Sequence, residues 1–160
     1  MLWFRKAANQ GNADAQYEIG NRYYRGEGVV QDYKEAMKWW RKAVDQGSVD
    51  AQVCIARGYY LGQGVVQDHK EAITWFRKAA DEGNSLAEGF FGIMYSEGQG
   101  VSKNLEQSYF WLLIATANTD VDDYEVFVRV RDYAASKLTA SQRNKIQKQA
   151  SEWMRQKGFE

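Results

Sequence analysis

The residue types that most often carry chemistry are scarce in this 160-residue chain. His69 is the only histidine and Cys54 the only cysteine. A catalytic or metal-binding histidine needs further ligands or an acid–base partner, and a cysteine nucleophile needs an activating base; the sequence places neither nearby. We therefore interpret both as ordinary helix residues and predict no catalytic residue, no metal site and no cofactor.

Three Gly-x-Gly pairs are the next candidates, because glycine-rich loops bind phosphate groups. They stand at 26 and 28, 62 and 64, and 98 and 100. Each follows a helical pattern rather than a strand and lacks a third glycine or a Gly-Lys-Ser/Thr sequence, so we predict turns. The acidic residues Asp120, Asp122 and Asp123 lack the glycine and distal glutamate of a calcium loop.

The glycine pairs recur because most of the chain repeats. The phrase Trp-Trp-Arg-Lys-Ala at 39–43 appears as Trp-Phe-Arg-Lys-Ala at 3–7 and 75–79, and an eroded copy begins at Trp111. The spacing is 36 residues each time. A fixed period in this range is typical of a solenoid, in which each unit packs only on its neighbours.

The amino-acid composition limits which fold classes and which kinds of partner are compatible with the chain. Apolar residues make up 44% of the chain and proline is absent, which favours an all-helical protein with a sizeable core. Basic and acidic residues number 21 each, so no net basic field attracts nucleic acid, and no apolar run is long enough for membrane insertion. No signal peptide is visible; we take the cytoplasm as the default compartment, or export if the native chain is longer.

We expect one solenoid domain with helix–turn–helix units at 12–47, 48–83 and 84–119, half a repeat at 2–11, and capping helices in 120–160. The helix N-caps are predicted at Asp14 and Asp50 for first helices, and at Asp32, Asp68 and Asn104 for second helices. In the first unit, the inward-facing residues of the second helix are predicted to be Ala36, Trp39, Trp40 and Ala43.

The second helix of the third unit is apolar on all sides, so it must be covered. We predict that two C-terminal helices cover it. The first spans 122–137, with an N-cap at Asp122 or Asp123 and Tyr124, Phe127, Val128 and Tyr133 as its apolar positions. The second begins with a capping box at Thr139 and Gln142 and carries Ile146, Ala150, Trp153 and Met154.

These features together resemble the Sel-1-like repeat, a tetratricopeptide-related unit, over residues 3–119. The residues that carry the resemblance in the first unit are Ala15, Ile19, Gly20, Tyr23, Gly26, Gly28, Asp32, Ala36, Trp39, Ala43 and Gly47. The resemblance implies a right-handed α/α superhelix that acts as a non-enzymatic adaptor for another protein or peptide. The alternative, penicillin-related binding or β-lactam hydrolysis as in the cysteine-rich branch, lacks a Ser-x-x-Lys sequence and cysteine pairs here.

In related superhelices the first helices line the concave surface, which makes one stripe of each first helix the predicted partner-binding groove. Its predicted residues are Glu18, Asn21, Arg25, Cys54, Arg57, Leu61, Phe90 and Ile93. We expect an apolar anchor at Phe90 and Ile93, unless the C-terminal helices cover them. A second predicted contact is self-association through apolar surface at Trp3 and Phe4, where a complete repeat would have a partner helix.

Overall fold

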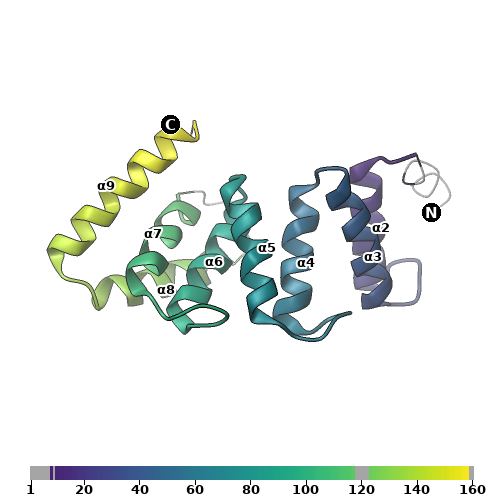
Figure 1. Cartoon of the computed structure of the whole chain (residues 1–160), viewed down its shortest axis with the longest axis horizontal. Helices are drawn as coiled ribbons and strands as arrows, with labels where there is room; N and C mark the ends of the chain where they lie inside the picture. Colours follow the sequence, from purple (N-terminus) through teal and green to yellow (C-terminus); the bar gives the residue numbers. More distant parts are fainter. Residues whose placement is uncertain (1–7, 9, 118–122, 159–160) are drawn as a thin grey trace. The chain divides into compact units, whose positions relative to one another are not determined.

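The computed structural model describes residues 8, 10–117 and 123–158 (Figure 1). These residues form eight α-helices and no strand, which confirms the predicted all-α fold. The helices are α2 (Ala13–Arg25), α3 (Tyr33–Asp45), α4 (Val49–Leu61), α5 (His69–Asp81), α6 (Ser85–Glu97), α7 (Leu105–Ala115), α8 (Tyr124–Ser136) and α9 (Ala140–Gln156). The helix predicted at 2–10, with Trp3 and Phe4, lies outside the described residues except for the buried Ala8 and the exposed Gln10, which lies in a turn.

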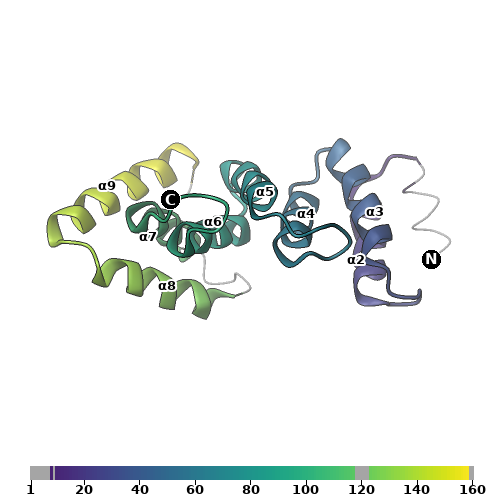
Figure 2. The same ribbon diagram turned by 60° about the horizontal axis from the view of Figure 1, so that its bottom comes forward.

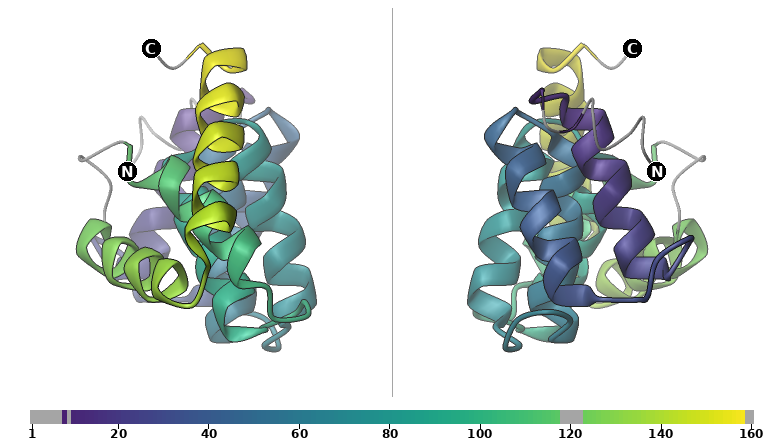
Figure 3. Two further views of the ribbon diagram at one scale, coloured as in Figure 1. Left: turned by 90° about the vertical axis from the view of Figure 1, so that its left-hand side faces the viewer. Right: turned by 90° about the vertical axis from the view of Figure 1, so that its right-hand side faces the viewer.

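The chain forms two compact units, residues 1–78 and 79–160. In the first unit α2 packs along α3, and α3 packs along α4 (Figure 3, right). In the second unit α6 packs along α7, and α8 and α9 pack on α7. The common element of both units is a pair of helices joined by a short turn.

Side-chain caps start the helices of each pair. Asn12, Ser48 and Asn84 accept hydrogen bonds from the N–H groups three residues further on, at 2.8, 3.2 and 3.0 Å. The prediction of Asp14 and Asp50 as caps was therefore wrong by two positions; both lie in the first helical turn, where a carboxylate still interacts favourably with the helix dipole. The caps predicted for the second helices at Asp32, Asp68 and Asn104 are confirmed.

Glycine ends the first helix of each pair. Gly26, Gly62 and Gly98 adopt φ values of 74°, 72° and 74°, in the left-handed region that glycine enters without a steric penalty. A backbone hydrogen bond then connects the end of the turn to α2, since the N–H of Asp32 donates to the carbonyl of Tyr23 at 2.9 Å. The predicted role of the Gly-x-Gly pairs as turns is confirmed.

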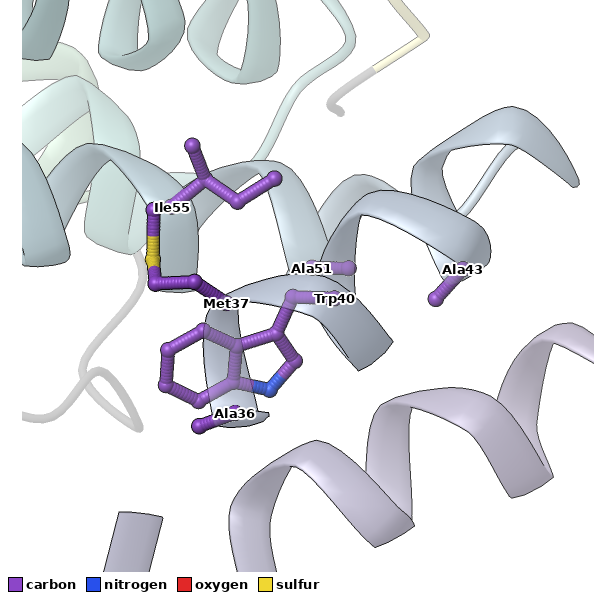
Figure 4. Packing of buried hydrophobic residues seen from close by; sticks show 6 residues of the cluster. All are labelled: Ala36, Met37, Trp40, Ala43, Ala51 and Ile55. Atoms are coloured by element: carbon purple, nitrogen blue, oxygen red, sulfur yellow. The ribbon is translucent and has the colours of Figure 1, made fainter. Parts of the chain in front are cut away.

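A cluster of Ala36, Met37, Trp40, Ala43, Ala51 and Ile55 forms the core of the first unit (Figure 4). The ring of Trp40 fits against α2 because position 20 is glycine; a Cβ there would overlap the ring. The indole N–H of Trp40 donates to Asn21 Oδ1 at 3.2 Å, which satisfies the one polar group that the buried ring carries. This core therefore depends on a close approach of the two helices.

The repeated tryptophans themselves are less buried than predicted. Trp39 and Trp75 are half-buried, whereas the residues that follow them, Trp40 and Phe76, are 3% and 0% exposed. Helical geometry explains the difference, since a residue four positions after the buried Ala36 lies directly above it. Trp39 lies at the edge of that face, and the Lys42 ammonium group stands 4.1 Å from its ring centroid.

In the second unit α8 and α9 both pack on α7, as predicted for the apolar helix. They lie on different sides of it (Figures 1 and 2). Phe127 and Ala134 of α8 and Ile146 and Ala150 of α9 are buried. Tyr133, predicted as part of the apolar face of α8, is instead 46% exposed, because it lies on the outer side of that helix. The capping box of α9 is confirmed, and Asp123 occupies the N-cap of α8 without a side-chain hydrogen bond.

One buried polar position recurs in each first helix: Gln16, Gln52 and Glu88, each at most 5% exposed. Gln16 donates from Nε2 to the carbonyl of Ala8 at 2.9 Å. Glu88 stands in the same register, but its Oε1 has no hydrogen-bond partner. Burial raises the pKa of Glu88 to about 7 from an ordinary 4.5, and the nearby ammonium group of Lys157 opposes the rise.

We predict that Glu88→Gln stabilises the protein, increasingly as the pH rises. In the wild type, the carboxyl group of Glu88 holds its proton more tightly in the folded protein than in the unfolded chain. The free energy of unfolding of the wild type therefore falls as the pH rises from 4.5 to about 7. The substitution removes this loss of stability, which amounts to up to about 3 kcal/mol at pH values above about 7. It also introduces an amide group that should donate to the Ala80 carbonyl, as the amide of Gln16 does to the carbonyl of Ala8. Chemical denaturation of both proteins across this pH range measures the difference; a difference independent of pH would contradict the prediction.

Candidate functional site

The predicted interaction stripe is accessible in the first unit. It comprises two register-related sets, Glu18, Asn21 and Arg25 on α2 and Cys54, Arg57 and Leu61 on α4. Four of the six side chains are half-buried, and Arg25 and Leu61 are exposed. Leu61 is 48% exposed, so the stripe of the first unit carries an apolar side chain at the C-terminal end of α4.

Asn21 connects the elements that form this stripe. Its Oδ1 accepts the Trp40 indole N–H from α3, and the Cys54 Sγ of α4 lies 4.0 Å away. Tyr17 borders the same place, and burial, followed by the proximity of Cys54, raises its pKa. The centre of the stripe is therefore an ordered group of side chains from all three helices.

The charges of the stripe are mostly engaged along its edges. Glu18 forms an ion pair with Arg22 at 3.2 Å, and the exposed Arg25 lies 3.7 Å from Glu27. Arg57 and Arg25 both lie close enough to Cys54 to oppose the rise of its pKa. Two guanidinium groups thus flank the centre of the stripe, one from each first helix.

Cys54 contributes a free, half-buried thiol to this stripe. Burial raises its pKa to about 12, the reverse of the shift that activates a cysteine nucleophile. His69 packs edge-on against Tyr60, with ring centroids 5.3 Å apart, at the start of α5. Within the described ranges no group of three or more His, Cys, Asp or Glu residues is arranged to hold a metal ion.

The predicted apolar anchor in the second unit is covered by α8. Ile93 is 7% exposed and clusters with Phe127, while the half-buried Phe90 packs edge-on against the Phe127 ring at 5.8 Å. These two residues are therefore internal contacts of the capping helix rather than a free anchor. The structure thus agrees with the alternative expectation, in which the C-terminal helices cover Phe90 and Ile93.

Gly89 is the residue that makes this cover fit, and sequence reasoning missed it. It occupies the register position of Tyr17 and Val53, and a Cβ on it would overlap the ring of Phe127. A glycine inside a helical pattern is unfavourable unless something approaches closely, which was the available signal. The buried Glu88 was also missed; its register with Gln16 and Gln52 could have indicated it.

No helix in the described part of the chain has both the length and the apolar character needed to cross a membrane.

Helix pairs with glycine turns at a fixed period define the class of this molecule, a helical repeat protein. Within that class, the Sel1 repeat profile matches residues 1–12, 13–48, 50–84 and 86–120, so the chain belongs to the Sel1 repeat family. This confirms the resemblance seen in the sequence. Sel1 repeat proteins are generally non-enzymatic scaffolds for protein interaction.

Several solved structures are similar to this chain, including two crystal structures. One is a Sel1 repeat protein from Oxalobacter formigenes, with a TM-score of 0.69 and 30% identity over 82% of this chain and 96% of that chain. The other is a protective antigen of uropathogenic Escherichia coli strains with an SLR fold, with a TM-score of 0.70 and 28% identity. That match covers 96% of this chain and 40% of the antigen. No curated protein matches the chain.

We predict that Cys54 reacts slowly in the folded protein. With a pKa of about 12, its thiolate is far rarer near neutral pH than that of an unfolded cysteine. A chromogenic disulfide reagent should therefore label the native protein about a hundredfold or more slowly than the protein unfolded in guanidinium chloride. Equal rates in the two states would contradict the assignment of Cys54 as an inert residue.

We further predict that Gly89→Ala destabilises the second unit. The new Cβ would overlap Phe127 and displace α8, at a cost of about 1–3 kcal/mol, which exceeds the ~0.5–1 kcal/mol that alanine gains over glycine in a helix. Denaturant unfolding measures the change. Lys148→Ala, on an exposed position of α9, is the control and should leave stability nearly unchanged; a Gly89→Ala protein more stable than wild type would contradict the packing argument.

Proposed function

We propose that this protein is a non-enzymatic interaction module that binds a segment of a partner protein along the stripe of the first unit. The stripe consists of Glu18, Asn21, Arg25, Cys54, Arg57 and Leu61. The observation that carries the proposal is the position of α8 in the second unit. There a helix of the chain itself lies on Phe90 and Ile93, the register equivalents of Cys54 and Arg57.

The way α8 binds supports this use of the surface. Phe127 contributes one ring to the face of α6, and Gly89 provides the space for it. At the corresponding position α4 has Val53, which is 4% exposed, while Cys54 and Arg57 beside it are half-buried. A partner segment would accordingly lie on the first-unit stripe through smaller contacts than Phe127 makes.

The chemistry of the stripe indicates the kind of segment it binds. Arg25 and Arg57 supply positive charge, Leu61 supplies exposed apolar area, and Tyr17 supplies an amphipathic ring. Binding surfaces are enriched in arginine and aromatic residues, and a few such residues carry most of the binding energy. The partner segment should therefore carry an apolar side chain that packs on Leu61 and Tyr17.

The test is quantitative affinity capture from a lysate of the source organism, with the full chain as bait. The stripe variant carries Arg57→Ala and Leu61→Ala. Its affinity for a specific partner should fall by about thirtyfold, since two truncations of contributing residues at about 1 kcal/mol each cost about 2 kcal/mol. Circular dichroism melting of both proteins verifies that the variant remains folded.

A matched control variant carries Lys70→Ala and Val66→Ala. It also removes one cation and one exposed apolar side chain, because Val66 is 88% exposed and Lys70 is exposed, but it lies outside the stripe. Its recovery of the partner should equal that of wild type. Equal losses in both variants, or no loss in either, would refute binding at the stripe.

A further inference from the structure

A cleft lies between α7 and α9 in the second unit, away from the face of α6 that α8 covers. Its volume is about 390 Å³, within the range that ligand sites in proteins show. Phe110, Ile146 and Trp153 form the apolar part of its lining, and Glu106 and Glu152 contribute carboxylates. Three glutamines complete the lining.

The sequence register shows that this surface differs from its counterparts in the earlier repeats. Glu106 occupies the position of Lys34 and Lys70, so a cation has been replaced by an anion. Phe110 occupies the position of Lys38 and Thr74, both of which are exposed to solvent. The outer face of the second helix is thus basic or polar in two repeats, and acidic and aromatic in the third.

Packing holds the aromatic part of the cleft in place. Phe110 meets Trp111 edge-on, with centroids 5.2 Å apart, and Trp111 meets Trp153 edge-on at 5.7 Å. Ile146 is 4% exposed. The half-buried rings of Phe110 and Trp153 therefore belong to a connected aromatic group that spans both helices.

The acidic part of the cleft is also partly fixed. Glu106 Oε1 accepts a hydrogen bond from Gln142 Nε2 at 2.7 Å, which orients the carboxylate. Glu152 is exposed on the opposite helix, and neither lysine nor arginine occurs among the described residues that line the cleft. The lining therefore carries two negative charges and no positive charge.

Lys157 is a cation that lies close to this lining. Its ammonium group stands 5.5 Å from the Trp153 ring centroid and donates to the Asp81 carbonyl at 2.6 Å. That hydrogen bond engages the ammonium group at the C-terminal end of α5 rather than with Glu106 or Glu152. Its position also shows that Trp153 accommodates a cation near its ring.

From this arrangement we propose that the cleft between α7 and α9 binds an arginine side chain presented by a partner protein. A guanidinium group is planar, stacks on aromatic rings and donates paired hydrogen bonds to carboxylates. Phe110 and Trp153 offer the rings, and Glu106 and Glu152 offer the acceptors. The site is separate from the stripe of the first unit and does not depend on it.

The experiment is an NMR titration of the ¹⁵N-labelled full chain with N-acetyl-L-arginine amide, at low salt. The Trp153 indole N–H and the backbone N–H groups of α9 should show saturable shifts. N-acetyl-L-citrulline amide has nearly the same shape without the charge, and should bind at least about fivefold more weakly, since charge-assisted hydrogen bonds are about twice as strong as neutral ones. N-acetyl-L-lysine amide, with a free side-chain ammonium group, tests whether the planar group matters and should also bind more weakly.

Variants test the carboxylates. Glu152→Gln keeps the shape of the side chain and should weaken arginine binding by about fivefold, whereas Glu125→Gln, which removes an exposed charge from α8, should change it less than about twofold. The proposal would be overturned if the citrulline or the lysine compound bound as tightly as the arginine compound. It would also be overturned if the two variants had equal effects, or if Trp153 showed no saturable shift.

Discussion

The close approach of two helices, allowed by small residues at their contact, is the constraint on which the rest of this structure depends. Gly20 lies against the ring of Trp40 in the first unit, and Gly92 lies against Leu112 in the second. A Cβ at either position would overlap the facing side chain, and a densely packed interior tolerates added atoms poorly. Because each pair is this tight, Trp40 and Leu112 reach the core, with 3% and 0% of their surface exposed.

The second helix of the last pair needs additional helices to cover its apolar surface. α7 carries apolar residues on all sides, and the chain covers it with α8 and α9. The cover requires a change on α6 as well, where Gly89 replaces the larger Tyr17 and Val53 of the other first helices. The same face is thus an internal helix-binding surface in the second unit and a half-exposed stripe in the first.

The buried polar residues of the repeats differ in how well their polar atoms are satisfied. Gln16 satisfies a carbonyl group with its amide, whereas Glu88 in the same register cannot do so while it is ionised. Cys54 lies beside Asn21 and Tyr17, and burial raises its pKa, which disfavours the thiolate form. Burial therefore raises the pKa of both Glu88 and Cys54.

Helix type, period, turns and most caps followed from the sequence alone, because a glycine at positive φ or an aspartate at an N-cap acts within a few residues. Local rules failed where two candidates compete, as for Asn12 and Asp14. Tertiary structure alone decided that Phe76, rather than Trp75, is fully buried, and that Phe127 covers Phe90 and Ile93. Hydrophobicity indicates that a side chain will leave water, but only the packing of distant segments determines which surface receives it.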